Sequence, residues 1–229
     1  MINRFPNDRV NNFSDAIFAI AITLLVLEVK VPPTEDLQTV GTIGILNRLI
    51  PSFIGLLISF FVTALYWRAH LTHAQFIKTY DNSLLWLTIW LLLFVVMLPF
   101  STGFYSKNFN YNGPFIFYCV NMILIGLFNY LIVRNIIKKD KDHELISPIM
   151  GKWFKFRASI APIIWLLSIG MVFINPSLAR WTFFLIFLVL MIGDRRFKKK
   201  SKKLDEARAR ELELAKEAEL ATIVQSPRD

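Results

Sequence analysis

Three side chains in two apolar segments have types and spacing suited to metal binding. His70 and His73 lie three residues apart in the stretch HLTH, so a helix would place both imidazoles on one face. Asp15, at the start of an earlier apolar segment, offers a carboxylate. Together they suggest a membrane-embedded metalloenzyme. No further strong ligand accompanies them, which favours buried structural histidines over a metal site.

A second group of polar residues leads directly into the first apolar run. Arg9, Ser14 and Asp15 precede AIFAIAITLLVLEV. Ser14 or Asp15 is a good N-cap, and a carboxylate is stabilised by the positive end of a helix dipole. A charge at a membrane edge also needs a protein partner. The second apolar segment ends with candidates for that partner: Trp67, Arg68, His70 and His73.

The composition indicates a membrane protein. Hydrophobic residues make up 55% of the 229 residues, and the mean hydropathy is +0.47. A soluble domain needs more polar side chains to cover its surface. The apolar runs do not alternate as barrel strands do, so the predicted fold class is all-α. The single cysteine, Cys119, excludes an internal disulfide.

Six segments are apolar enough to cross a bilayer, which takes about 20 helical residues. They predict a six-helix unit over residues 1–198, followed by a charged cytoplasmic helix or tail over residues 199–229. Only the link NPS separates the last two spans, so these two must be antiparallel. The predicted helices cover residues 13–31, 50–70, 84–103, 114–135, 158–174 and 178–194.

The basic residues predict both termini in the cytoplasm. In that orientation, the outward-facing members of the 26 Lys and Arg residues are Lys30, Arg48, Lys107 and Arg180. The net charge of +9 then needs no nucleic acid to explain it. The basic clusters beside the membrane are expected to meet anionic lipid head groups. We therefore expect a multi-pass protein of a plasma membrane.

The first predicted helix has two different faces. At 100° per residue, four side chains fall on one stripe about 100° wide, and Asp15 lies on the opposite side. We call these four residues the apolar stripe: Ile20, Thr23, Leu24 and Leu27. Periodicity alone favours helix packing or lipid contact for such a stripe. Glu28 lies at its margin and suits either an ion-path mouth or an interfacial anchor.

The stretch TVGTIG at residues 39–44 resembles the start of a potassium filter. Such a filter replaces the hydration shell of the ion with backbone carbonyls. Thr39, Val40 and Gly41 match, but the Tyr-Gly that should follow is Thr42-Ile43. The few residues after the first span also leave no room for a pore helix. We therefore expect no filter at this position.

The stretch RVNNFSD contains the pattern R-x-x-x-F-S-D, which is typical of the transmembrane protein 175 family of potassium-permeable channels. AIFAIAITLLVLEVKVP resembles the first helix of that family. SFFVTALYWRAH resembles its second helix, with Trp67 and His70 at the W-x-x-H positions. NSLLWLTIWLLLFVVMLPFSTGFY resembles its third helix. The resemblance covers roughly residues 9–106.

This resemblance implies a prokaryotic homotetramer with a pore lined by the first helix and without a P-loop filter. Ile20 would form a hydrophobic gate, and Thr23 would lie near a transient potassium ion, with modest selectivity over sodium. Leu24 and Leu27 would continue the ion path. Residues implied to brace this helix are Arg9, Phe13, Ser14, Asp15, Trp67 and His70, the last as the polar partner on the second helix.

Two alternatives to a channel remain open besides the metalloenzyme. A secondary transporter for a monovalent cation or small solute would want inverted repeats and helices broken at the midplane. Pro99 and Pro162 interrupt their segments near the ends instead. A non-conducting, lipid-interacting scaffold is the other alternative. The implied channel has no cofactor, with potassium as the permeant ion.

Overall fold

The computed structural model describes residues 5–77, 79–140, 145–202 and 210. The chain divides into two units, Met1–Ile186 and Phe187–Asp229. Helices are the regular elements throughout these described ranges, and the β-structure found there is one isolated antiparallel bridge between Phe5 and Tyr80. The predicted all-α fold class is confirmed at this level.

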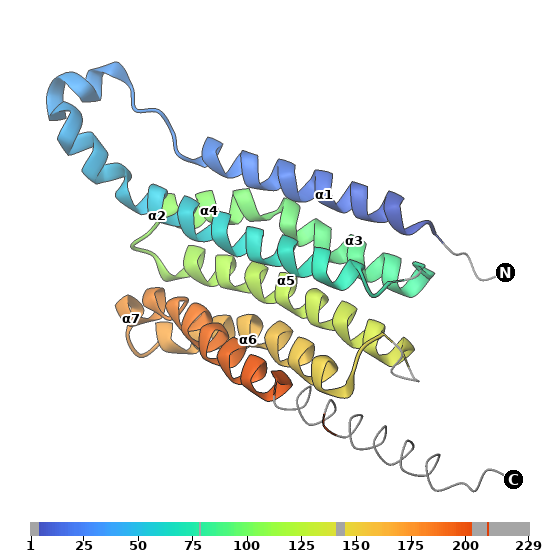
Figure 1. Cartoon of the computed structure of the whole chain (residues 1–229). Coiled ribbons are helices and arrows are strands. Elements are labelled where there is room, and N and C mark those ends of the chain that lie inside the picture. Colours follow the sequence, from blue (N-terminus) through green and yellow to red (C-terminus); the bar gives the residue numbers. More distant parts are fainter. Residues whose placement is uncertain (1–4, 78, 141–144, 203–209, 211–229) are drawn as a thin grey trace, which may run out of the picture. The chain divides into compact units, whose positions relative to one another are not determined.

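Seven α-helices and one 3₁₀ turn have their bounds within the described part of the first unit. Neighbouring long helices run in alternating directions along the chain (Figure 1). In order, the elements are α1 (Asn7–Leu24), η1 (Leu25–Glu28), α2 (Thr34–Ala74), α3 (Asn82–Val96), α4 (Leu98–Lys107), α5 (Asn112–Lys139), α6 (Pro148–Val172) and α7 (Pro176–Trp181).

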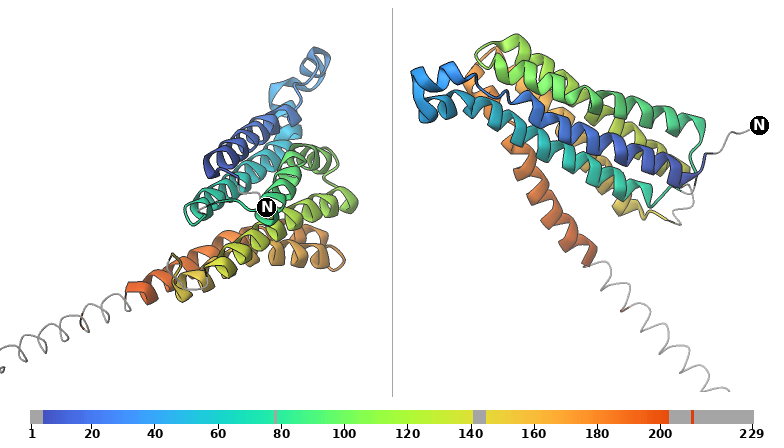
Figure 2. Two further views of the ribbon diagram at one scale, coloured as in Figure 1. Left: turned by 90° about the vertical axis from the view of Figure 1, so that its right-hand side faces the viewer. Right: turned by 90° about the horizontal axis from the view of Figure 1, so that it is seen from above.

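The core of the first unit lies around α5. This helix packs against α6, α3 and α4, while α1 packs against α2 and α3 (Figures 1 and 2). Fully buried side chains such as Leu91, Met122 and Ile132 fill the space between these helices. The arrangement leaves α1 at the margin of the unit, with one face in contact and the other free.

Several helix boundaries follow from local chemistry. Asp81 caps α3 by accepting a hydrogen bond from the Leu84 amide, and Ser147 caps α6 by accepting one from Met150. The break between α3 and α4 lies just before Pro99. A proline lacks the amide hydrogen and crowds the carbonyl four residues earlier, which is the physical reason for the break.

Gly41 bends α2 sharply. Its φ of 73° lies in the left-handed region, which glycine enters without the steric cost of a Cβ atom. Residues on both sides of Gly41 are helical, and the Thr39 hydroxyl donates to the Glu35 carbonyl. The TVG stretch therefore forms a helix bend here rather than the extended row of carbonyls that a filter needs.

Five helical stretches in the described residues are long and apolar enough to cross a membrane. They overlap the first five predicted spans, and each is longer than the prediction, although the first and the fifth end two or three residues earlier than predicted. The five stretches are Asn7–Glu28, Thr34–Ala74, Asn82–Lys107, Asn112–Lys139 and Pro148–Val172.

The sixth predicted span, residues 178–194, is interrupted. The helix α7 ends at Trp181, a turn follows at Thr182 and Phe183, and residues 184–202 are helical. The Thr182 hydroxyl donates 2.6 Å to the Ala179 carbonyl and contacts Ser168, a bonding pattern that tightens the last turn. A single membrane-crossing helix over 178–194 stays a prediction.

The predicted tail, residues 199–229, belongs to the second unit. Residues 187–202 of this unit are helical, as is Arg210. The remainder of the predicted tail helix lies outside the described residues.

Candidate functional site

The two faces predicted for the first helix are present in α1. The packed face consists of side chains spaced three or four residues apart, in contact with neighbouring helices. Its members are Val10, Ser14, Phe18, Ala21 and Leu25, all buried. The small side chains of serine and alanine allow the helix to lie close to its neighbours. The buried Ser14 hydroxyl donates a hydrogen bond of 2.8 Å to the Val10 carbonyl.

The apolar stripe lies on the opposite, open face. Ile20 is 58% exposed and Leu27 is 70% exposed, and Thr23 and Leu24 are also exposed. Leu24 ends α1 and Leu27 lies in η1. Because side chains three residues apart eclipse one another in a 3₁₀ turn, the change of helix type keeps these two leucines in line. One chain alone thus leaves the whole stripe uncovered.

The hydroxyl of Thr23 has a defined orientation. It donates a hydrogen bond of 2.8 Å to the Ile20 carbonyl. Because the hydroxyl hydrogen is used in this bond within the helix, the lone pairs of the oxygen are free to accept a hydrogen bond or to coordinate a cation outside the helix. The stripe therefore carries one electron-rich oxygen among three aliphatic side chains.

Asp15 is tied to the second helix through Trp67. The indole Nε1 of Trp67 donates 2.9 Å to the Asp15 carboxylate. His70 was the expected polar partner, but its ring lies 6.0 Å from that of Phe18, centroid to centroid, and its buried Nε2 has no hydrogen-bond partner. The rotation of α2 brings the indole, rather than the imidazole, to the carboxylate.

Arg9 and Phe13 are not brought to this contact. Both are exposed, and neither side chain has a hydrogen bond or an ion pair within the described residues. Of the six predicted bracing residues, the single chain joins Asp15 with Trp67 and buries Ser14 and His70.

The histidine pair does not form a metal cluster with Asp15 in the described part of the chain. No group of three or more His, Cys, Asp or Glu residues is found there that could hold a metal ion. His73 packs its ring edge to face against Phe154, at 5.5 Å between centroids. It therefore fills space between α2 and α6.

Two further contacts that hold α1 were not predicted. At its first end, Asn7 donates 2.7 Å to the Ile77 carbonyl, and the Tyr80 hydroxyl donates 3.0 Å to Asn11. Burial raises the pKa of Tyr80 to about 12, so its hydroxyl stays protonated as a donor. Asparagines four residues apart before the apolar run were the signal for this contact.

At its other end, Glu28 forms an ion pair of 2.6 Å with Lys107 of α4. Gly103 makes room for it, because a Cβ atom on that glycine would come within 1.9 Å of the Glu28 carboxylate. Between the two roles considered for Glu28, the geometry favours the anchor.

Comparison with known proteins finds a family that resembles the first part of the chain. Residues 9–99 match the sequence profile described as endosomal/lysosomal potassium channel TMEM175. Over this stretch, the chain is similar to the TMEM175 family. With five apolar helices long enough to cross a membrane in its described residues, the chain is a multi-pass membrane protein.

Relatives and solved structures extend the match beyond residue 99. A protein named potassium channel from Chryseobacterium sp. (strain P1-3) is 27% identical over 194 residues, which is 85% of this chain and 97% of the relative. A second potassium channel, from Chamaesiphon minutus, is 37% identical over 99 residues, 43% of this chain and 49% of the relative.

The fold is similar to that of solved TMEM175 proteins. The crystal structure of a lysosomal potassium-selective channel TMEM175 homologue from Chamaesiphon minutus matches with a TM-score of 0.70 and 25% identity, over 83% of this chain and 97% of that chain. A variant of the potassium channel MtTMEM175 matches in fold with a TM-score of 0.58 and 21% identity, over 83% and 93%.

Proposed function

We propose that this protein is a potassium channel in which four copies arrange α1 around a central pore. One observation carries the proposal: α1 packs one face inside its own chain and leaves the apolar stripe uncovered. The relatives named as potassium channels support the choice of ion. Channels are not enzymes, which leaves the metalloenzyme alternative without support.

Ile20 is proposed as the gate. Four isoleucine side chains around an axis make a narrow apolar ring, and such a constriction blocks ions by losing its water. Leu24 and Leu27 continue the lining. Lipid contact alone would not require the polar Thr23 to share a stripe with these three aliphatic residues.

Thr23 is proposed to hold a partly dehydrated ion. Its hydroxyl hydrogen is bonded inward to the Ile20 carbonyl, so four oxygens would point lone pairs towards the axis. Hydroxyl dipoles are few and weak compared with a carbonyl filter. They favour the cation that dehydrates more easily, so we expect modest selectivity for potassium over sodium.

The surrounding contacts suit a fixed pore helix. The bond between Asp15 and Trp67, in the first half of α1, and the ion pair between Glu28 and Lys107, at the end of η1, connect the α1–η1 stretch to its own chain. Arg9 and Phe13, exposed in the single chain, are then left to contact neighbouring copies. Bracing by these two residues is part of the tetramer proposal.

The membrane placement proposed here is that of a prokaryotic plasma membrane with both termini in the cytoplasm. Basic side chains gather where α5 ends and α6 begins, which would place them beside anionic head groups of the inner leaflet. Those described in the first unit are Arg134, Lys138, Lys139, Lys152, Lys155 and Arg157.

Planar bilayer recording of the reconstituted full chain tests the gate. Ile20→Asn places an amide in the constriction, so we expect it to hold water and to raise the open probability or conductance. Ile163→Asn is the matched control, because this side chain is 60% exposed on α6, away from the stripe. Unaltered currents in Ile20→Asn would refute the gate.

The same recording tests selectivity and mechanism. Thr23→Ala removes the coordinating oxygens. The reversal potential in mixed potassium and sodium should therefore move towards the value of a channel that does not distinguish the two ions. A reversal potential equal to that of the unsubstituted chain contradicts the assignment. Unitary currents distinguish a channel from a transporter, which would instead show saturable, coupled uptake.

A further inference from the structure

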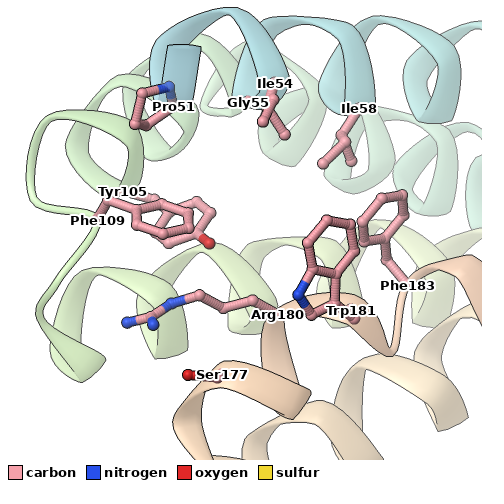
Figure 3. Close-up of a pocket in the computed structure, with 10 residues that line it drawn as sticks. All are labelled: Pro51, Ile54, Gly55, Ile58, Tyr105, Phe109, Ser177, Arg180, Trp181 and Phe183. Atoms are coloured by element: carbon pink, nitrogen blue, oxygen red, sulfur yellow. The ribbon is translucent and has the colours of Figure 1, made fainter. Parts of the chain in front are cut away.

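A cavity of about 200 Å³ lies between α2, α4 and α7, on helices other than α1 (Figure 3). Most of its wall is aliphatic or aromatic. From α2 it takes Ile54 and Ile58, and from α4 and the turn after it Tyr105 and Phe109. No role in the proposed ion path uses this cavity.

One cation lies in this apolar cavity. The Arg180 side chain extends across it, below Tyr105 and Phe109 and above Ser177 (Figure 3). Its guanidinium carbon is 4.7 Å from the centroid of the Phe109 ring, and its buried Nε has no hydrogen-bond partner. Within the described residues, no carboxylate forms an ion pair with Arg180.

The apolar wall of the cavity and the guanidinium of Arg180 together indicate the chemistry of a ligand. A partly buried guanidinium without a counterion is costly, and a planar fork of donors suits a phosphate or carboxylate oxygen. An inorganic anion alone would leave the aliphatic volume empty. An amphipathic anion satisfies both parts, with its head on Arg180 and a hydrocarbon chain between Ile54 and Ile58.

We infer that the cavity binds an anionic phospholipid of the surrounding bilayer, with the phosphate at Arg180 and one acyl chain against α2. Trp181, 60% exposed beside Arg180, is of the type enriched where membrane meets water, the depth of a lipid phosphate. The cavity lies at the end of the unit opposite to the basic cluster of α5 and α6, so it is a separate site from the inner-leaflet contacts.

Native mass spectrometry of the purified full chain tests this site. Phosphatidic acid is titrated against diacylglycerol with identical acyl chains, against a free fatty acid and against inorganic phosphate. We expect phosphatidic acid to bind and Arg180→Gln to weaken it about tenfold, the effect of losing a charge-assisted hydrogen bond. Arg48→Gln is the matched control, since this arginine is exposed on α2 and lines no part of the cavity.

Two more variants separate head from tail. Ile54→Trp fills the cavity and should remove binding of phosphatidic acid while Arg180 stays in place. Arg180→Lys keeps the charge and should retain part of the affinity. This result would show that the loss in Arg180→Gln is due to the missing charge and not to misfolding. The melting temperature of every variant is measured as a check on folding. Equal binding of diacylglycerol, preference for the fatty acid or for phosphate alone, or equal losses in Arg180→Gln and Arg48→Gln would each overturn the inference.

Discussion

At the scale of single residues, the contact between Asp15 and Trp67 distinguishes two side chains of one motif. Trp67 holds the carboxylate, whereas His70 is buried beside Phe18. Residue types alone left both side chains as candidates, and the family resemblance implied His70, because a sequence does not specify how a helix is rotated about its axis. Three residues along α2 correspond to nearly a full turn, and packing decides which side chain reaches Asp15.

Trp67→Phe is predicted to destabilise the protein by about 1 kcal/mol, because the carboxylate loses a hydrogen-bond donor at a partly exposed position. Thermal melting of the purified protein in one detergent measures the effect. In a double-mutant cycle with Asp15→Asn, the two substitutions should be non-additive. Strict additivity would mean that the bond contributes nothing to stability.

At the scale of elements, the junction between α3 and α5 carries a pH-dependent contact. Desolvation acts to raise the pKa of Asp81, but hydrogen bonds from Lys139 and from the Leu84 amide, together with the Lys139 charge, hold that pKa below its usual range. A lowered pKa stabilises the fold above the ordinary carboxyl pKa. This contribution disappears as the pH falls through the lowered value.

We predict that Asp81→Asn reduces the acid sensitivity of the melting temperature. Melting is measured from neutral pH down to about pH 3, a range that covers the ordinary carboxyl pKa and lower values. The unsubstituted chain should lose more of its melting temperature over this interval than the variant does. Parallel curves for the two proteins would show that this ion pair does not contribute. Asp8→Asn, on an exposed side chain of α1, is the control.

The elements also show what the sequence allowed us to anticipate. The two faces of α1 follow from helical periodicity, and the five long apolar stretches follow from the length and hydropathy of the apolar runs. The bounds were too short at polar ends: α2 begins at Thr34, because its polar first turn is helical as well. The interruption at Thr182 depends on a hydroxyl that bonds within its own turn and to Ser168, a tertiary contact without a signature in hydropathy.

At the scale of the whole molecule, the uncovered apolar stripe is suited to an interface between several copies of the chain. A face of Ile20, Leu24 and Leu27 is more apolar than solvent tolerates, yet Thr23 is more polar than lipid prefers. Assembly around an axis satisfies both side-chain types. The cysteine content makes this testable, since Cys119 is the single thiol and is buried.

In a Cys119→Ala background, Ile20→Cys is predicted to form disulfide-linked dimers under mild oxidation in membranes. In the proposed tetramer, a narrow ring at Ile20 would bring the thiols of neighbouring copies within bonding reach. Leu166→Cys, at a 63% exposed position on α6, serves as the control and should stay monomeric on a denaturing gel. Cross-linking of Leu166→Cys but not of Ile20→Cys would place a different face at the interface.

Glu28 of η1 packs closely against α4 at Gly103. The carboxylate is held by Lys107 and occupies the space where a side chain at position 103 would lie. A sideways displacement of Leu27 therefore either breaks this ion pair or carries α4 with it. Tyr105, on the same short helix, borders the cavity that holds Arg180. One ten-residue helix thus contacts both the end of the stretch that carries the apolar stripe and the wall of the cavity that contains Arg180.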